Sequence, residues 1–340
     1  MKRIQRVRLA DIAKRLNVSK VTISKALRNH PDISEKMKTR IKHVAEEMNY
    51  VPDFLARALS SKNTNIIGVV LPEINHTFFA AALDGIYSAA TEKNFEIVLT
   101  VSFEDRIREI KNIQTLLSMN VDGILISISQ NTHDYGIFNN VREKKIPLVF
   151  FDRVVHNLGF STIEVEDKKG AELAVEYAIS LGYTKIAHFA GYLNISIGKE
   201  RCLGYKEVLK KHSIPIKKEW VIEGGFNEED GYTSFKKLYK NANLPELIFA
   251  VTDPVAMGIY DAAKEVGLRI PHDIGVIGYS NNLIARYLSP PLTTVSQPAK
   301  ELGKIATNLL INEIEGSKVA EPQQLLLPVA LKARESCVRR

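Results

Sequence analysis

Polar and aromatic side chains follow many of the apolar runs in the second part of the sequence. These residues are Asn75, Phe78, Phe79, Ser127, Asp152, Asn194, Ser196, Arg201, Phe226, Asp253, Ser280 and Gln297. Aromatic rings pack on the face of a small ring, and carboxylate and guanidinium groups form hydrogen bonds with its hydroxyl groups. Together these residue types suit the binding of a sugar or a similar polar ring. For Phe78 and Phe79, packing in a core is the alternative, and for Asp253 it is capping of the helix that Pro254 begins.

A second group of residues lies on one face of a predicted helix near the N-terminus. At 100° per residue, this face combines the short and cationic side chains of Lys20, Val21, Ser24, Lys25 and Arg28. Residues 1–62 contain 15 Lys and Arg against 6 Asp and Glu, a net charge of +9. The other 278 residues contain 31 against 33, a net charge of −2. A basic head of this kind favours a polyanion, since neutralised phosphates release their counterions. A solvated basic tail is the alternative.

The motifs of several function classes are missing. No G-x-G-x-x-G follows a strand, and neither G-x-x-x-x-G-K-[ST] nor G-x-S-x-G occurs. The 8 histidines form no pair with metal-ligand spacing, and Cys202 and Cys337 are too far apart for a zinc motif. We therefore expect no metal and no cofactor, and an enzyme on this chain is only a rival interpretation. Two isolated cysteines fit a reducing cytoplasm.

Length and hydropathy set the broad class. The composition, with 45% hydrophobic and 25% charged residues in 340, is that of a globular protein, and the length suggests two or three domains. No run approaches the ~20 apolar residues of a membrane span, and the basic N-terminus is not followed by an apolar stretch. Neither secretion nor membrane insertion is expected. A solute-binding protein, which would need export, is thus the second rival interpretation.

The first fifty residues are predicted to form three helices. Apolar residues recur at helical spacing in Leu9–Leu16, Lys20–Arg28 and Met37–Met48. Ser19 and Ser34 stand where the second and third helices need an N-cap. Two short helices joined by a three-residue turn are typical of a helix-turn-helix, whose second helix enters the major groove of DNA.

From Ile66 onward, apolar β-rich runs alternate with amphipathic segments. Predicted strands begin at Ile66, Glu96, Val121, Ile146, Lys185, Glu219, Leu247, Ile274 and Leu325. Predicted helices cover residues 78–94, 105–120, 168–181, 199–212, 253–266 and 299–315. This alternation indicates parallel sheets covered on both faces, and two doubly wound lobes suit about ten strands better than one sheet. Ligands of such sheets bind beyond the carboxyl ends of the strands, where the polar residues lie.

Nine segments of the sequence have a characteristic order and spacing. They are LADIAKRLNVSKVTISKALRN, NYVPDFLARALSSK, IIGVVLPEINHTFF, IPLVFFDR, GAELAVEYAISLGYTKIAHFAG, RCLGY, VTDPVAMG, IGVIGYSN and PPLTTVSQP. Together they resemble the lactose-repressor (LacI/GalR) family of bacterial transcription regulators over nearly the whole chain. The resemblance implies a multidomain protein with an all-α helix-turn-helix DNA-binding head, a hinge helix and an α/β two-lobed core similar to periplasmic sugar-binding proteins. It also implies a homodimer, or a dimer of dimers, that acts at a palindromic operator in double-stranded DNA at the bacterial nucleoid.

On this resemblance the expected domains are residues 1–50 for the head, 51–64 for the hinge helix and linker, and 65–340 for the core. Within the core, the first lobe is expected to cover about 65–164 and 295–323. The second lobe is expected to cover about 165–294 and 324–340.

The family's DNA-contacting positions can be placed on this sequence. Lys20, Val21 and Lys25 match the base-reading positions, and Lys25 stands where Arg is more usual. Phosphate contacts or caps are implied for Ser19, Thr22, Ser24, Arg28 and Ser34. In the hinge, Leu59 matches the leucine that the family inserts into a minor-groove step, and Ala56 suits a close approach to the groove or to a partner helix. The alternatives are surface filling for Val21, packing for the threonine of the recognition helix, and core packing for Leu59.

The twelve polar and aromatic residues of the core are implied to line the site of an effector, a sugar or sugar derivative. Arg201, Phe226 and Asp253 match the family pattern most closely. Ser280 stands where many relatives carry Asp, which removes a strong acceptor for a hydroxyl group. Ligand binding between the lobes is expected to change the angle between them, and with it the spacing of the hinge helices and the affinity for DNA.

Overall fold

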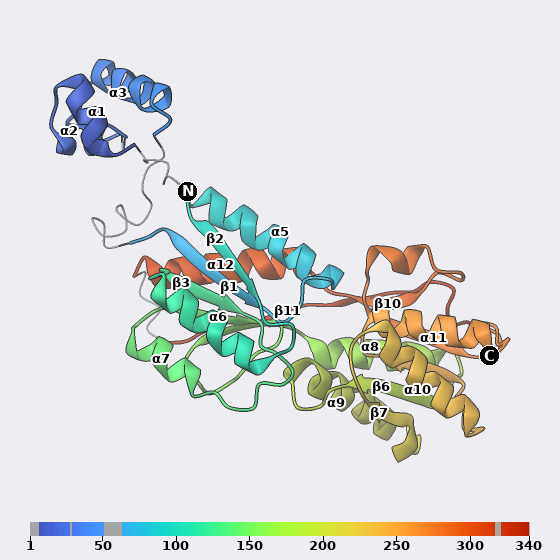
Figure 1. The fold of residues 1–340 in the computed structure, drawn as a ribbon. Helices are drawn as coiled ribbons and strands as arrows, with labels where there is room; N and C mark the ends of the chain where they lie inside the picture. Colours follow the sequence, from blue (N-terminus) through green and yellow to red (C-terminus); the bar gives the residue numbers. More distant parts are fainter. Residues whose placement is uncertain (1–6, 28, 51–62, 317–320, 340) are drawn as a thin grey trace, which may run out of the picture. The chain divides into compact units, whose positions relative to one another are not determined.

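The computed structural model describes residues 7–27, 29–50, 63–316 and 321–339 of the chain. Contacts divide the chain into two compact units, Met1–Thr64 and Asn65–Arg340. Figure 1 shows the elements of both. The predicted DNA-contacting positions Arg28, Ala56 and Leu59 lie outside the described residues.

The first unit is a bundle of three helices. They are α1 (Leu9–Leu16), α2 (Lys20–Leu27) and α3 (Glu35–Glu47). Each helix contributes one fully buried isoleucine, Ile12, Ile23 or Ile41, to a common core. The alternation of apolar and polar residues at helical spacing therefore produces a closed bundle, as predicted.

Both serines stand at the predicted helix starts, but only one acts as a cap. The Ser19 Oγ accepts a hydrogen bond from the backbone N of Thr22 at 3.0 Å, which satisfies a donor of the first turn of α2. Ser34 occupies the N-cap position of α3, yet its side chain makes no capping hydrogen bond. The prediction that the Ser34 side chain caps α3 is therefore wrong. Its hydroxyl group is exposed instead.

A six-stranded parallel sheet forms the first lobe of the second unit. Its strands, in spatial order, are β11 (Gln324–Leu327), β5 (Ser161–Val165), β4 (Leu148–Phe151), β3 (Gly123–Ile126), β1 (Ile66–Leu71) and β2 (Glu96–Val101). Figure 1 shows helices on both faces of this sheet, namely α5 (Thr77–Glu92) and α12 (Ala299–Ile314) on one and α6 (Arg106–Ser118) and α7 (Ile137–Glu143) on the other. Because both faces are covered, the strands read as the continuous apolar runs seen in the sequence.

A second six-stranded sheet forms the second lobe. Its strands, in spatial order, are β12 (Ala330–Lys332), β10 (Thr293–Ser296), β9 (Gly275–Ser280), β8 (Leu247–Ala250), β6 (Ile186–Gly191) and β7 (Val221–Glu223), with only β12 antiparallel among them. The helices of this lobe are α8 (Asp167–Ser180), α9 (Ser196–Lys211), α10 (Glu228–Lys240) and α11 (Asp253–Glu265), with short 3-10 turns at Lys218–Trp220 and Leu283–Arg286. Neighbouring residues of β8 show how it is covered. Ile248 packs in the cluster of α10 and α11, whereas Phe249 packs in that of α8 and α9.

Glycine allows two helix pairs to approach very closely. A Cβ on Gly85 of α5 would lie 1.9 Å from the carbonyl oxygen of Lys300, and one on Gly258 of α11 would lie 1.9 Å from that of Glu228. Such contacts leave no room for a side chain. The tight packing of the pairs α5–α12 and α10–α11 therefore fixes where α5 and α10 begin. The loops that precede these two helices reach the site described below.

The chain crosses between the lobes three times, after β5, β10 and β11. The predicted return to the second lobe at residue 324 is placed too early, because Gln324–Leu327 pairs with β5 in the first sheet. The predicted return to the first lobe at residue 295 is also early, because β10 pairs with β9 as far as Ser296. Both differences arise because short strands carry little pattern that assigns them to one sheet. In the described part of the chain, no helix is long and apolar enough to span a membrane.

His188 lies fully buried in β6 and gives the second lobe an acid-sensitive element. Its ring stacks on Phe249 with 4.6 Å between ring centres, and its Nδ1 lies 2.9 Å from the carbonyl oxygen of that residue. Burial lowers the pKa of His188 to about 3, because the fold holds the neutral ring. In the unfolded chain this histidine binds a proton below a pH of about 6.5, whereas in the folded chain it does so only near pH 3. Its contribution to stability is therefore complete above about pH 6.5 and is lost as the pH falls toward 3.

We expect the free energy of unfolding to fall by about 1.4 kcal/mol for each pH unit below about 6.5 through His188 alone. Relative to the unchanged chain, the thermal midpoint of the His188→Phe variant is expected to rise as the pH is lowered from 7.5 to 4.5, because the variant lacks the His188 contribution. The comparison with the unchanged chain isolates His188 from Asp152 and Asp253, whose raised pKa values act in the opposite direction. The exposed His272→Gln variant is the control, and identical slopes for all three proteins would contradict the assignment.

Candidate functional site

Two of the cavities between the lobes adjoin each other at the carboxyl ends of the parallel strands. The deep cavity has a volume of about 20 Å³ and is lined by His76, Phe78, Phe79, Asp152, Arg153, Ile197, Arg201, Phe226, Thr252, Ser280 and Gln297. The outer cavity has a volume of about 340 Å³ and is lined by Glu73, Asn75, His76, Thr77, Glu104, Gln130, Arg153, Tyr192, Gly225, Phe226, Asn227, Glu228, Asp230, Pro254, Met257, Asn282 and Ile284. The outer volume lies at the lower end of the roughly 300–1,000 Å³ of small-molecule sites. The position agrees with the rule that ligands of doubly wound sheets bind beyond the strand ends.

Arg153 lines both cavities and lies between aromatic rings of the two lobes. Its guanidinium carbon is 5.9 Å from the ring centre of Phe79 and 5.0 Å from that of Phe226. Its Nη1 forms an ion pair with Glu104 Oε1 at 2.6 Å, while its buried Nε has no hydrogen-bond partner. A buried donor without a partner is unfavourable, so Arg153 is poised to donate to an acceptor atom of a ligand.

Arg201 forms the second charged element of the deep cavity. Its Nε donates to Asp167 Oδ1 at 2.7 Å, and its Nη1 donates to the carbonyl oxygen of Val251 at 2.6 Å. The guanidinium carbon also lies 3.7 Å from the ring centre of Tyr279. Burial raises the pKa of Asp167, and the neighbouring Arg201 opposes that shift. Arg201 therefore binds the elements of the second lobe together while it presents part of its guanidinium group to the cavity.

Asp152 supplies a carboxylate to the deep cavity from the end of β4. The Ser127 Oγ donates to its Oδ2 at 3.3 Å, and the same hydroxyl oxygen accepts from the backbone N of Arg153 at 3.4 Å. Burial raises the pKa of Asp152 to about 6, and the charge of Arg153 opposes the shift. Ser127 thus orients Asp152 and Arg153 through these two hydrogen bonds.

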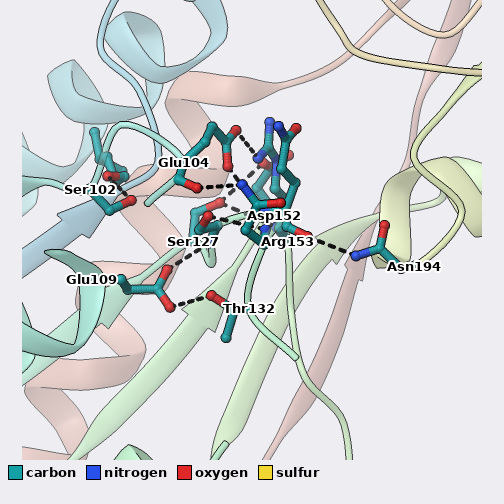
Figure 2. A network of polar contacts seen from close by, with 12 residues as sticks. Ser102, Glu104, Glu109, Ser127, Thr132, Asp152, Arg153 and Asn194 are labelled. Carbon is teal, nitrogen blue, oxygen red and sulfur yellow. Dashed lines mark hydrogen bonds and ion pairs between the residues drawn. The ribbon is translucent and has the colours of Figure 1, made fainter. Parts of the chain in front are cut away.

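A polar network fixes the loop that follows β3, as Figure 2 shows. Glu109 of α6 is fully buried, and its two oxygens accept from the backbone N of Ser129 and from Thr132 Oγ1, both at 2.6 Å. Glu104 accepts from the backbone N of Gln130 at 2.7 Å, next to its ion pair with Arg153. The loop is therefore held at both ends before any ligand contacts it.

Three sets of contacts join the lobes around the cavities. Asn194 Nδ2 donates to the carbonyl oxygen of Gln130 at 2.7 Å, a bond visible in Figure 2. Ser196 Oγ accepts from the backbone N of Val154 at 3.3 Å. Thr77 Oγ1 donates to Asn282 Oδ1 on the opposite side. The described conformation is consequently one in which the lobes are closed on each other.

The solvent side of α2 forms a separate candidate surface in the first unit. Val21 is 64% exposed, and Lys20 is exposed beside it. The Nζ of Lys25 forms an ion pair with Asp32 Oδ2 at 2.7 Å, so one cation of this face is partly neutralised by the chain itself. The pKa of Asp32 is lowered by its hydrogen bond to Lys25 and by the nearby His30.

Comparison with known proteins identifies both units. Residues 8–53 match the model of bacterial regulatory proteins of the lacI family, and residues 175–337 match a periplasmic binding protein-like domain. The chain is 31% identical over 307 residues to the ribose operon repressor of Haemophilus influenzae, covering 90% of this chain and 92% of the relative. The chain belongs to the lacI family of bacterial regulatory proteins.

Solved structures of lacI-family proteins agree with this assignment. A Lac repressor dimer bound to operator and the anti-inducer ONPF superimposes with a TM-score of 0.87 at 26% identity, over 98% of this chain and 100% of that one. A LacI family regulator from Enterococcus faecium with bound ribose superimposes with a TM-score of 0.71 at 28% identity, over 81% of this chain and 99% of that one. The predicted fold class is confirmed, and the lacI-family chain is a transcription regulator rather than an enzyme.

Eight of the twelve core residues predicted for the ligand site line the cavities of this lacI-family protein. They are Asn75, Phe78, Phe79, Asp152, Arg201, Phe226, Ser280 and Gln297. Ser127, Asn194 and Ser196 lie behind or beside the cavities and bind other protein groups there. Their contacts hold the lobes and the Asp152–Arg153 pair in place.

Asp253 also lies away from both cavities. It is fully buried, its Oδ2 accepts from the backbone N of Asn282 at 2.7 Å, and its Oδ1 accepts from Thr294 Oγ1 at 2.5 Å. The alternative that Asp253 caps α11 is wrong, because Thr252 is the N-cap and its side chain accepts from the backbone N of Val255. Asp253 instead ties the start of α11 to the loop after β9.

The sequence prediction missed most of the outer cavity. Glu73, His76, Glu104, Glu228 and Asp230 line it and were not among the twelve predicted residues. For Glu104 a signal existed, since it follows β2 at the same edge of the sheet as Asp152. The three acidic residues in the first turn of α10 give no such signal in the sequence, because acidic residues are common at helix N-termini, where they favour the helix dipole.

Proposed function

We propose that this protein is a homodimeric repressor that binds a palindromic operator in double-stranded DNA and is controlled by a sugar or sugar derivative bound between the core lobes. The observation that carries the proposal is the presence, in one chain, of a cationic, exposed helix face in a small bundle and of a cavity lined by polar and aromatic side chains between two α/β lobes. The Lac repressor neighbour, a dimer bound to operator, supports the DNA half of the proposal. The neighbour with bound ribose supports the sugar half. A dimer of dimers is also compatible with a palindromic operator, because each dimer can bind one operator.

The proposed division of labour follows the predicted domains, with residues 1–50 as the DNA-binding head, 51–64 as the hinge and 65–340 as the effector-binding core. In the head, Lys20, Val21 and Lys25 contact base edges from the solvent side of α2. Phosphate contacts are assigned to Ser19, Thr22, Ser24, Arg28 and Ser34. The hydroxyl groups of Ser19 and Thr22 also form a hydrogen bond with each other. Contacts of Ala56 and Leu59 with the minor groove stay predictions.

The proposed effector is held by the deep cavity and its surroundings. Phe78, Phe79 and Phe226 supply apolar faces, while Asp152, Arg153 and Arg201 supply hydrogen bonds to hydroxyl groups. Because hydrogen bonds such as Asn194 to Gln130 join the lobes, a ligand that prefers either the closed or an open arrangement would shift their relative population. A coupling to operator affinity then equals the difference between the ligand affinities of the two arrangements. Such a regulator works where the chromosome is, in the bacterial cytoplasm at the nucleoid.

The test of the proposal begins with selection of duplexes from a random library by the full chain, which is expected to yield a two-fold symmetric site. On that site, Lys25→Ala is expected to weaken binding about tenfold and to relax the preference at one base pair in each half-site, since a base contact contributes roughly 1–3 kcal/mol. Gel-shift titration at fixed salt measures the affinity. Repeating the selection with the variant measures the base preference.

Two further variants sharpen this experiment. Asp32→Asn releases Lys25 from its ion pair and removes a negative charge beside the DNA, so operator affinity is expected to rise severalfold. Lys144→Ala removes an exposed lysine of the core and serves as the matched control. A Lys25→Ala protein with the affinity and base preference of the control would exclude Lys25 from the reading face. A full chain that selects no common sequence would overturn the proposed function.

A further inference from the structure

The outer cavity carries an unusual excess of negative charge. Four carboxyl groups line it, those of Glu73 and Glu104 from the first lobe and Glu228 and Asp230 from the second. The only Lys or Arg among the described residues that line it is Arg153, and its Nη1 is paired with Glu104 at 2.6 Å, as Figure 2 shows. In the part of the chain that the structure describes, no cation lies within ion-pair distance of Glu73, Glu228 or Asp230. Three carboxyl groups therefore face one cavity without a protein counterion.

The surroundings of these groups strengthen their mutual repulsion. Burial raises the pKa of Glu73, and the charges of Glu104 and Asp230 raise it further, while Arg153 opposes the shift. His76 supplies no positive charge at neutral pH, because burial lowers its pKa to about 4. The two lobes thus bring like charges toward each other when they close, which is favourable only with a cation between them.

A second observation shows that the same cavity is built for a polar ligand. Arg153 lines the cavity and is 5% exposed, and its buried Nε has no hydrogen-bond partner. Tyr192, Phe226 and Met257 add apolar surface from the second lobe. A matching ligand therefore has an acceptor atom for Arg153, an apolar face and a positive charge.

We propose that the outer cavity binds the protonated amino group of an amino sugar, with the hydroxyl groups of the sugar directed at Arg153. The inference rests on the proposed function, because it names the class of effector for the site between the lobes. An ammonium group has three donors and can form hydrogen bonds with carboxyl groups of the cavity. Sugars that carry a carboxylate or a phosphate meet repulsion in the same place, so the charge of the cavity selects against them.

Matched pairs of sugars test the proposal with the full chain. Glucose, galactose and mannose are each compared with glucosamine, galactosamine and mannosamine at pH 7, and glucuronate serves as the anionic probe. Isothermal titration measures the dissociation constants, and gel shift measures the effect on the operator complex. We expect the amino member of the best-bound pair to bind about tenfold more tightly than its neutral partner, because hydrogen bonds to charged groups are the stronger ones. Glucuronate is expected to bind more weakly than glucose.

Variants then locate the effect in the cavity. In the Glu73→Gln/Glu228→Gln protein the preference for the amino sugar over its neutral partner is expected to disappear. Glu219→Gln, at an exposed position of the second lobe outside the cavity, is the matched control and keeps the preference. Thermal midpoints of the three proteins show whether each variant is folded.

The outcomes separate this inference from the function on which it rests. If the operator complex responds to neutral sugars, and in every pair the amino sugar binds equally or more weakly, the amino-sugar assignment is overturned and the regulator stands. If the chain selects an operator but responds to no sugar of either kind, the sugar class and the assignment fail together. If the double variant keeps the full preference, the amino group binds elsewhere and the outer cavity is excluded. Failure to select an operator counts against the proposed function alone.

Discussion

Replacing Arg201 by alanine is expected to lower the free energy of unfolding of the core by about 3–5 kcal/mol and to abolish the response to the effector. The loss of stability follows from Asp167, which is buried and relies on the Arg201 Nε at 2.7 Å for its counterion. The variant also loses the hydrogen bond to Val251 and the contact with the Tyr279 ring. A loss of this size should lower the thermal midpoint by roughly 10 °C.

The two expected effects of Arg201→Ala have different origins and can be separated. Adding Asp167→Asn removes the uncompensated buried charge, so the double variant should regain part of the stability. It should not regain the response to ligand, because Arg201 itself lines the deep cavity. Lys199→Ala, an exposed cation on the same helix, is the control for charge and helix propensity. A folded Arg201→Ala protein that responds to the same ligand with unchanged affinity would remove Arg201 from the site.

Arg201 also shows what a sequence pattern can and cannot predict. The resemblance to the family predicted a ligand site at Arg201, and in the structure Arg201 lines the deep cavity. Its ion pair with Asp167 joins positions 34 residues apart and has no local signature. The same limit applies to Asp253, because its two carboxylate oxygens accept from Asn282 and Thr294, which lie 29 and 41 residues away in the sequence.

The fold itself was largely predictable because its signals are local. Continuous apolar strands and amphipathic helices alternate along the core, and this pattern alone indicates parallel sheets covered on both faces. The outer cavity was not predictable, since Glu104 and Asp230 meet there only through the closure of two lobes. The sequence around Asp230 indicates a helix start with a capping box between Asn227 and Asp230. It does not indicate that the Asp230 carboxylate also faces a cavity.

Removing residues 1–64 is expected to abolish specific operator binding and to leave a folded core that still binds the effector. The head is a separate bundle with its own core around Ile12, Ile23 and Ile41, and the second unit has its own buried clusters in both lobes. Residues 1–62 hold the net charge of +9, so the remaining chain, near −2, has no excess of cations for phosphates. Specific affinity should therefore fall by at least about 10³-fold, the usual lower bound of the gap between specific and non-specific binding.

Three measurements on the truncated chain decide the outcome together. Gel shift with the selected operator measures the loss of DNA binding, and thermal melting shows whether the core is folded. Titration with the best-bound sugar should give the same dissociation constant as the full chain without DNA, since every cavity-lining residue lies beyond residue 64. Retained operator binding would show that the core carries the DNA site and would refute the role of the basic head. Lost sugar binding in a folded core would show instead that residues before 65 complete the ligand site.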